Sequence, residues 1–345
     1  MKLARTTTSG DNRTRQRLPR WLFPAVGYAV SIACLIWVYQ GFDWKKEWPK
    51  LSATDPGWVI VAVVADIAVY ICQGWRWNLL LRPLTQVSVW KSVQAVYIGL
   101  FANEILPLRS GEVIRCYLIR RWGDLPFSVV VSSALIERLM DGVWLILGFY
   151  LVGAYVDLPG WLVGISQALV VAMAFVAVLV AWAVLHKSHA HETLSRSRWA
   201  EMFRHVVDGT HAMGNARTFV IAFGLSLVYL LLQVLPVYAL VRGYGLNVSI
   251  AQSAAVLVVL RLGTVIPQAP SNVGSFQALT ILGLHLFGVD RSSSTGFATL
   301  LFLVVTVPLW IAGFVALVAT RMRLGDIHRE AHGHMEKRQP AAEAH

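Results

Sequence analysis

The stretch NEILPLRSGEVIR runs from Asn103 to Arg115 and packs four charged residues into thirteen positions. Pro107 and Gly111 interrupt it, and it lies in a chain that is 56% hydrophobic and only 14% charged. Its four charged residues are Glu104, Arg109, Glu112 and Arg115. Charged side chains in so apolar a setting need water, a partner or a lined cavity. What these residues do therefore depends on whether their neighbours lie in a bilayer.

The composition is that of an integral membrane protein. The mean hydropathy is +0.58 over 345 residues, with 14 tryptophans and 14 phenylalanines, which is too apolar for a soluble domain of this size. Six apolar runs reach the length of about 20 residues that a helix needs to cross a hydrocarbon core of about 30 Å. We therefore expect an all-α polytopic membrane protein with about six transmembrane helices. The six runs are 22–39, 58–80, 128–151, 161–185, 218–241 and 294–319.

The charges that flank these runs predict the orientation, because Lys and Arg near helix ends stay in the cytoplasm. Basic residues dominate residues 1–20, 186–217 and 321–345, whereas acids and bases balance in residues 40–57. Arg76 is interpreted as a flank charge that marks a return to the cytoplasm. We therefore expect a multi-pass protein of the cytoplasmic (inner) membrane with both termini in the cytoplasm.

The same bias explains the formal net charge of +11. No zinc-finger spacing or aromatic RNA-binding motif accompanies the basic residues, so no nucleic-acid partner is expected. The chain is predicted to divide into a cytoplasmic basic leader at 1–20, a single transmembrane domain at 21–320 and a disordered cytoplasmic tail at 321–345.

Two further apolar segments do not fit simple spans. Residues 92–106 are short, and the following GEVIRCYLIRR, residues 111–121, is too polar to cross lipid. A full crossing would also carry its arginines outside, against the predicted orientation. A re-entrant hairpin that enters from the cytoplasm and returns by Arg121 removes this conflict. Irregular backbone at such depth must be buried in protein or line a wet cavity.

The second segment, residues 258–290, also has an apolar arm, a break and a second arm. Pro107-x3-Gly111 in the first break matches Pro270-x3-Gly274 in the second, at a separation of 270 − 107 = 163 residues. The predicted orientation makes the two hairpins enter from opposite faces. Interrupted segments in corresponding halves of an inverted repeat point to a transporter's substrate site.

Three motifs resemble those of a known family. They are the run from Asn103 to Arg115, then Glu137-Arg138-x-x-Asp141, and then Pro267-x-x-Pro270-x-x-x-Gly274. Together they are similar to the flippase-like membrane domain of lysylphosphatidylglycerol synthases and their stand-alone relatives, over residues 20–320 or so. The resemblance implies lipid translocation or lipid-carrier handling in a bacterial or archaeal cytoplasmic membrane.

The second hairpin departs from the family's usual pattern. Ser271 follows Pro270 where glycine is usual, and Gln277 stands where an acid is usual. Whether Gln277 marks a degenerate second hairpin is left open. The roughly 26 residues after the last run (345 − 319) leave no room for a soluble aminoacyl-transfer domain. Synthase activity is therefore not expected, and the protein is not expected to be an enzyme.

Glu137, Arg138 and Asp141 lie near the middle of a predicted span, where each charge costs roughly 2.5–3.5 kcal/mol. Glu137 and Asp141 share one helix face, and Arg138 can reach Asp141 one turn away. Two interpretations remain: a structural ion-pair clamp, and a site for a charged headgroup or a proton relay. Asp66 and Arg261 are lone intramembrane charges that either join this site or act as packing partners.

The sequence predicts a substrate-binding site and no catalytic residue. Arg109 and Arg138 are expected to bind a lipid phosphate through their guanidinium groups. Glu137 and Asp141 are expected to neutralise Arg138 when the cavity is empty. The predicted substrate-binding residues are Asn103, Glu104, Arg109, Glu112, Arg115, Glu137, Arg138, Asp141, Pro270, Asn272, Gly274 and Gln277.

No cofactor and no metal are expected. The histidines within residues 186–191 and 328–334 are interpreted as solvated, disordered chain, because no two-histidine-plus-acid motif accompanies them. The chain also contains no phosphate-binding loop of the GxxxxGK[ST] type and no GxSxG elbow. ATP-driven pumping by this chain and serine hydrolysis are therefore disfavoured.

These patterns favour a secondary lipid transporter, or flippase, for a phospholipid or a polyprenyl-phosphate-linked lipid. The alternative is a membrane enzyme acting on a lipid-phosphate carrier, either glycosyltransferase-like or phosphatase-like, with Glu112 or Glu137 as base. A third possibility is a scaffold. Membrane lipids with a phosphate-bearing headgroup are the expected partners, and binding of envelope-biosynthesis enzymes is left open. No motif identifies the lipid, the direction, the coupling ion or the oligomeric state.

Overall fold

The computed structural model describes residues 22–106, 110–157, 160–185, 216–263 and 272–320, together with residues 322 and 325. Within these ranges the secondary structure is helical and contains no strand. The predicted leader and nearly all of the predicted tail lie outside them. The helices are α1 (Leu22–Tyr39), α2 (Trp44–Ser52), α3 (Pro56–Leu81), α4 (Val89–Ile105), α5 (Gly111–Gly123), α6 (Phe127–Gly153), α7 (Gly160–Leu185), α10 (Ala216–Tyr244), α11 (Ile250–Gly263), α12 (Ser275–His285) and α13 (Arg291–Ala319).

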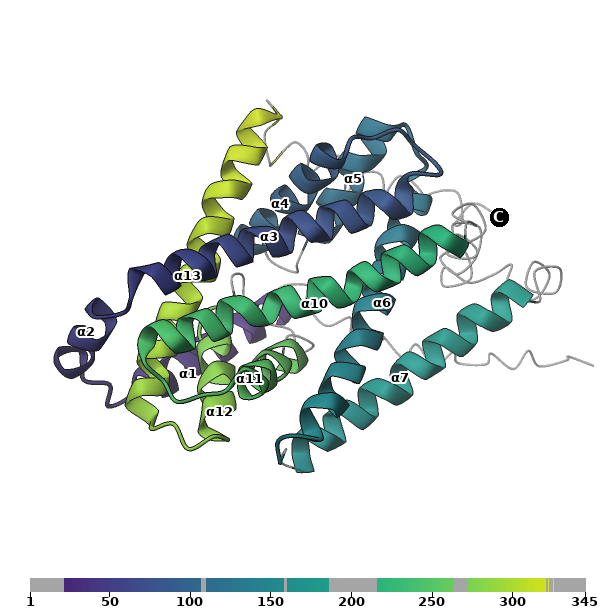
Figure 1. Cartoon of the computed structure of the whole chain (residues 1–345). Helices are drawn as coiled ribbons and strands as arrows, with labels where there is room; N and C mark the ends of the chain where they lie inside the picture. Colours follow the sequence, from purple (N-terminus) through teal and green to yellow (C-terminus); the bar gives the residue numbers. More distant parts are fainter. Residues whose placement is uncertain are drawn as a thin grey trace, which may run out of the picture.

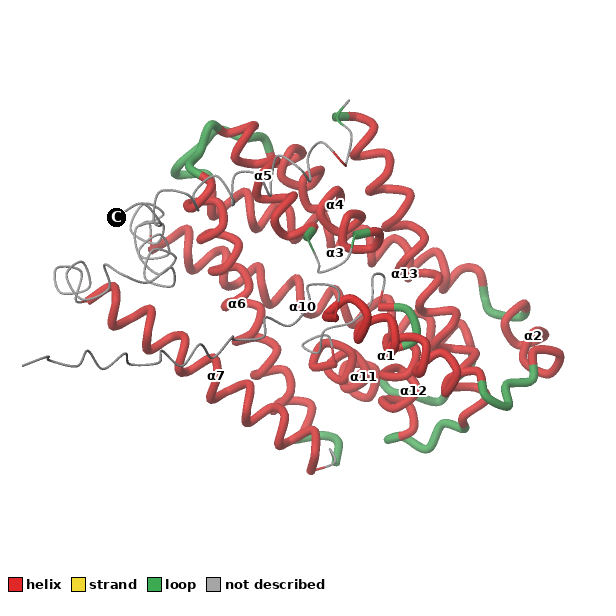
Figure 2. Tube along the Cα trace, turned by 180° about the vertical axis from the view of Figure 1, so that it is seen from behind, coloured by secondary structure: helices red, strands yellow, loops and turns green. Residues whose placement is uncertain are grey.

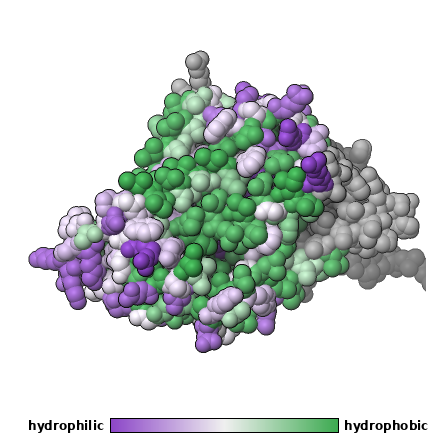
Figure 3. Space-filling view, in the orientation of Figure 1, coloured by the Kyte–Doolittle hydropathy of each residue, from purple (hydrophilic) through white to green (hydrophobic). Residues whose placement is uncertain are grey.

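All six predicted apolar runs fall within helices, and the molecule is built as a multi-pass membrane protein. Three helices, α3, α10 and α13, are long and apolar enough to cross a bilayer by length and composition. A fourth span is added if α1 and α2, which are bent by 89° relative to each other, count as one. α6 spans 27 residues but carries three charged residues in its middle. Figure 3 shows a broad apolar surface between hydrophilic residues at the α2 end and at the upper right.

Helices α3 and α10 form the centre of the fold. They lie side by side and run in opposite directions (Figures 1 and 2). At one end the backbone N–H of Asp55, just before α3, donates to the carbonyl oxygen of Gly243, near the end of α10, at 3.1 Å. A side chain at Gly243 would place its Cβ 2.8 Å from the Cβ of Trp58. The glycine therefore permits the two helices to approach closely at this end.

Helices α4 and α5 form the first hairpin. At its tip, the Gly111 N–H donates to the side-chain oxygen of Asn103 at 2.8 Å, and a Cβ on Gly111 would collide with the carbonyl oxygen of Gly99. At its base, the Thr85 hydroxyl donates to the carbonyl oxygen of Gly123 at 3.2 Å. The arms are therefore antiparallel, and Gly111 in the opening motif is required for their contact.

Helices α11 and α12 form the second hairpin. Gly263, at the end of α11, lies against Leu279, whereas Gly283, near the end of α12, lies against Val256. The later residue of α11 thus contacts the earlier residue of α12, and the earlier residue of α11 contacts the later one, so these arms are also antiparallel. Residues 264–274 connect them, and of these residues 264–271 lie outside the described ranges.

The two hairpins enter the molecule from opposite ends. The base of α4–α5 lies at the C-terminal end of α3, where Asn78 donates to the carbonyl oxygen of Val87 at 2.8 Å. The base of α11–α12 follows directly from the end of α10, which the Asp55–Gly243 bond holds against the start of α3. The hairpins thus point toward each other along the central pair.

The order helix, hairpin, helix occurs twice along the chain: α3, α4–α5, α6 and then α10, α11–α12, α13. The separation of 163 residues between the two Pro-x3-Gly motifs also relates the helix boundaries. Leu81, the end of α3, maps to position 81 + 163 = 244, the end of α10. Gly111 maps to 274, one residue before α12, and Phe127 maps to 290, one residue before α13. With α3 and α10 antiparallel, the second unit runs in the opposite sense to the first.

The close contact at the first hairpin gives a direct test. We predict that Gly111→Ala lowers the melting temperature of the purified protein in detergent by several degrees, because the new methyl group collides with the backbone of Gly99. The matched control is Gly224→Ala on α10, where a Cβ meets nothing within 4 Å. That change should leave the melting temperature unchanged or slightly raised, since alanine favours helix. Equal melting temperatures for the two variants would contradict the described packing of α4 on α5.

Candidate functional site

A cavity with about 750 Å³ of water-accessible space is lined by residues near the tips of both hairpins. This volume is in the range of small-molecule binding sites. The central pair α3 and α10 and the helices α6 and α13 complete the wall. Polar lining residues from the two hairpins are Asn103, Glu104, Glu112, Arg261 and Asn272.

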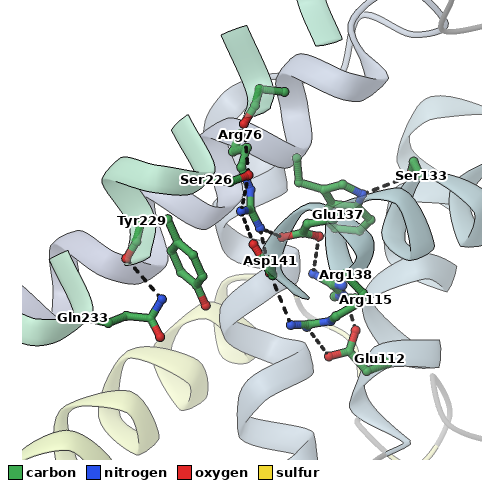
Figure 4. Close-up of polar contacts among 12 residues, drawn as sticks. Arg76, Glu112, Arg115, Ser133, Glu137, Arg138, Asp141, Ser226, Tyr229 and Gln233 are labelled. Carbon is green, nitrogen blue, oxygen red and sulfur yellow. Dashed lines mark hydrogen bonds and ion pairs between the residues drawn. The ribbon is translucent and has the colours of Figure 1, made fainter. Parts of the chain in front are cut away.

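Beside this cavity lies a cluster of three arginines and three acids, which we call the ionic cluster (Figure 4). Its formal charges cancel. It joins α3, α5 and α6, three helices that are distant in sequence. Its members are Arg76, Glu112, Arg115, Glu137, Arg138 and Asp141.

Glu137 is the centre of the cluster. One carboxylate oxygen accepts from Arg76 at 2.7 Å, and the other accepts from Arg115 at 3.1 Å. Arg76 also binds Asp141, one turn along α6, and donates to the hydroxyl of Ser226 on α10 at 2.8 Å. The side chains of Arg76 and Glu137 are both fully buried. A buried carboxylate that bridges two buried guanidinium groups holds the three helices in one arrangement.

Aromatic side chains cover the buried arginines. The guanidinium of Arg76 lies 4.8 Å from the ring centroid of Tyr229, and that of Arg115 lies 4.7 Å from the ring of Trp77. The indole N–H of Trp77 donates in turn to Ser133 on α6 at 3.0 Å. Cations at such distances are attracted to the ring faces. The inner part of the cluster is therefore enclosed and supported on several sides.

The outer part of the cluster is accessible. Arg138 donates to Glu112 at 2.6 Å, and these side chains are 43% and 39% exposed. Both residues line the cavity, whereas Arg76 and Arg115 do not. Arg138 is therefore the one arginine of the cluster that combines an exposed side chain with a place in the cavity wall. Arg261, on the second hairpin, lines the same cavity and donates to the side-chain oxygen of Gln233.

The structure brings most of the predicted substrate-binding residues together. Five of them belong to the ionic cluster: Glu112, Arg115, Glu137, Arg138 and Asp141. Three more line the cavity: Asn103, Glu104 and Asn272. Arg109 and Pro270 lie outside the described residues.

Gly274 and Gln277 have a different place. Gly274 has φ +84°, and its N–H donates to the side-chain oxygen of Gln277 at 2.7 Å, so that Gln277 closes the N-terminus of α12. Gln277 is buried, and neither residue is in the cavity wall. Their geometry is that of a helix start, because a side-chain acceptor here satisfies a backbone N–H that helix geometry leaves free.

Two expectations need correction. Arg76 does not mark a cytoplasmic flank: it is completely buried and faces α6. Glu137, which was expected to neutralise Arg138, instead binds Arg76 and Arg115 through its two oxygens. The nearest acids to Arg138 are Glu112 and, at 3.8 Å, Asp141. The available signal was the position of Arg76 inside an apolar run, where a charge requires a buried partner.

Sequence patterns did not identify the polar face that α3 and α10 present to the cavity. Tyr70 and Gln73 contribute from α3, and Tyr229 and Gln233 contribute from α10. Single Tyr and Gln residues in apolar helices carry no recognisable motif. Within the described residues no group of three or more His, Cys, Asp or Glu side chains could hold a metal ion. The two histidine-rich segments lie outside those residues.

Comparison with known proteins covers nearly the whole chain. A family model described as "Lysylphosphatidylglycerol synthase TM region" matches residues 25–313. A UPF0104 membrane protein of Methanocaldococcus jannaschii is 23% identical over 84% of this chain and 92% of its own length. Another, from Methanothermobacter thermautotrophicus, is 24% identical over 87% of this chain and 88% of its own length.

A more distant similarity involves an enzyme. The glycosyltransferase AglD of Haloferax volcanii is 23% identical over 37% of this chain, which corresponds to 20% of that protein's length. No solved structure matches the chain.

The bridging role of Glu137 predicts a particular pattern of stabilities. Glu137→Gln should destabilise the protein by about 3–5 kcal/mol, because it leaves two buried arginines sharing too few acids. The double variant Glu137→Gln, Arg115→Met should be less destabilised than the single variant, because Arg76–Asp141 and Arg138–Glu112 remain as balanced pairs.

Thermal unfolding in detergent gives the stability of both variants. Asp157→Asn, which changes an exposed acid, is the matched control. The control should melt like the wild type. A double variant that melts below the single variant would show that charge balance does not hold the cluster together.

Proposed function

The chain belongs to the lysylphosphatidylglycerol synthase transmembrane-region family, and on that premise we propose that it is a secondary lipid transporter. In this proposal the cavity carries the headgroup of a phosphate-bearing lipid across the membrane while the acyl or prenyl tails stay in the bilayer. The observation that carries the proposal is that hairpin tips entering from opposite ends line one cavity.

Opposed hairpins favour transport over one-sided chemistry. A transporter must open its site to both faces of the membrane, whereas an enzyme needs access from one face only. Many secondary transporters place the substrate between two inverted repeats, at helices that are broken near the midplane. The repetition of helix, hairpin, helix in opposite directions fits that architecture.

Arg138 is the proposed phosphate ligand. A guanidinium keeps its charge at all relevant pH values, so it needs an acid when the cavity is empty and must release it when phosphate binds. Glu112 can give up Arg138 at low cost, because it also binds Arg115 at 2.7 Å. Asp141 likewise keeps its bond to Arg76. The neighbours of Arg138 thus remain paired after it exchanges its partner.

The proposed orientation puts the base of the first hairpin in the cytoplasm. Arg82, Lys91, Arg120 and Arg121 gather at that base, with Asp124 as an acid beside them. The opposite end, around α2, mixes acids and bases. Lys and Arg of short loops stay on the cytoplasmic side of a bacterial or archaeal inner membrane. Lys91 then faces the cytoplasm and Asn247, in the connection between α10 and α11, faces outward.

A second candidate is a membrane enzyme acting on a lipid-phosphate carrier. The observation in its favour is the partial similarity to the glycosyltransferase AglD. In that case Glu112 would take the proton from a water or hydroxyl group that attacks the carrier while Arg138 binds the carrier phosphate, and the site would open to one face.

Transport is tested in vesicles that contain the purified protein and a fluorescent phospholipid, with dithionite quenching from outside to report translocation. We predict that Arg138→Gln abolishes translocation and that Arg138→Lys, which keeps the charge but loses the planar fork, reduces it at least tenfold. Arg82→Gln, at an exposed arginine beyond the end of α3, is the control and should translocate at the wild-type rate.

Folding of each variant is checked by its elution profile and melting temperature. Wild-type translocation in folded Arg138→Gln would refute the proposed role of Arg138. Absence of translocation by the wild type, together with conversion of an added lipid-phosphate carrier, would favour the enzyme.

A further inference from the structure

Two buried hydrogen-bond acceptors in the cavity wall lack donors. They are Oδ2 of Asp66 and Oε1 of Gln73, both on α3, and no donor among the described residues reaches either atom. The two residues are 6% and 2% exposed, and both line the cavity. Leaving a buried acceptor without a donor is costly, and most buried polar groups in proteins are paired.

The two acceptors lie on one face of α3. Seven residues separate them, which is about two helical turns and about 10 Å along the axis. Tyr70 lies between them and lines the same cavity. The side chains at 66, 70 and 73 therefore form a polar stripe along the wall, and two of the three offer oxygen atoms without donors.

The corresponding stripe on α10 differs, because the side chain of its glutamine is already hydrogen-bonded. The positions 163 residues later are Tyr229, Gln233 and Pro236, and all three line the cavity. There the side-chain oxygen of Gln233 already accepts from Arg261, and its amide donates to the carbonyl oxygen of Tyr229 at 3.1 Å. The α10 stripe thus carries a glutamine side chain that is already paired, with Arg261 of α11 as a donor, whereas the α3 stripe carries two acceptors with no donor among the described residues.

We propose that Asp66 and Gln73 form a subsite for the hydrogen-bond donors of the lipid headgroup, while its phosphate binds Arg138. This inference rests on the proposed lipid-binding function. A headgroup that donates to either oxygen carries N–H or O–H groups next to its phosphodiester. An ammonium headgroup and a hydroxylated headgroup share this chemistry, and the experiment separates them.

The experiment measures binding of four short-chain lipids to the full-length protein in detergent by calorimetry. Phosphatidylmethanol offers the phosphodiester and no donor, and phosphatidylcholine adds a positive charge but still no donor. Phosphatidylethanolamine adds N–H donors, and phosphatidylglycerol adds O–H donors. The wild type should bind one or both of the last two about tenfold more tightly than phosphatidylmethanol, as one hydrogen bond to a buried charged group allows.

Two variants assign that preference to the subsite. In Asp66→Leu and in Gln73→Met, which both remove the acceptor oxygen, the tenfold preference should disappear, while the affinity for phosphatidylmethanol stays within about twofold of the wild type. Gln94→Met removes a glutamine whose amide donates to the carbonyl oxygen of Ala316, away from the cavity, and should keep the preference. Melting temperatures show that each variant is folded.

The outcomes are distinct. Preference for phosphatidylethanolamine assigns an ammonium ligand, and preference for phosphatidylglycerol assigns a hydroxylated one. Equal affinity for all four lipids, or tight binding of phosphatidylcholine, would overturn the donor subsite and leave the phosphate site in place. Failure of the wild type to bind even phosphatidylmethanol would instead refute the proposed lipid-phosphate function, and the subsite with it.

Discussion

The packing of α3 and α5 against α6 depends on one constraint: an arginine in an apolar interior cannot lose its charge and must have an acid beside it. Glu137 meets this constraint for two arginines at once, at 2.7 Å from Arg76 and 3.1 Å from Arg115. Because these arginines come from α3 and α5, the carboxylate fixes the first hairpin and the central helix against α6. The position of the cavity wall on this side follows from that bridge.

The same balance explains why Arg138 stands apart from its two neighbours. Arg76 and Arg115 are enclosed by aromatic rings and bridged by Glu137. Arg138 is half exposed and shares its main partner, Glu112, with Arg115. A cluster whose inner members are rigidly paired and whose outer cation can exchange its partner suits reversible binding of an anion. In the proposed transporter, the opposed hairpins would supply the access from two faces that transport requires.

The all-helical fold and its six long apolar helices could be predicted from sequence, because helices in lipid satisfy their backbone hydrogen bonds internally and appear as long apolar runs. The two interrupted segments were recognisable because their breaks are too polar to cross lipid. The Glu137–Arg138–Asp141 group was recognisable because charges are costly in the middle of a span. The pairing of Arg76 with α6 was not, since it depends on how α3 packs rather than on any local pattern. Two further features also depend on packing and could not be predicted. Among the described residues, no donor reaches Asp66 or Gln73, and Gln277 caps the start of α12.

The central claim, one cavity that opens to both faces, is tested most directly by thiol labelling. In a background without Cys34, Cys72 and Cys116, Thr306→Cys places a thiol in the cavity wall. Lys91→Cys and Asn247→Cys serve as markers of the inner and outer face. A membrane-impermeant maleimide, applied to intact cells and to inverted membrane vesicles, should label each marker from one side and Thr306→Cys from both. Labelling of Thr306→Cys from a single side, with both markers behaving as expected, would contradict a transporter and favour a one-sided site.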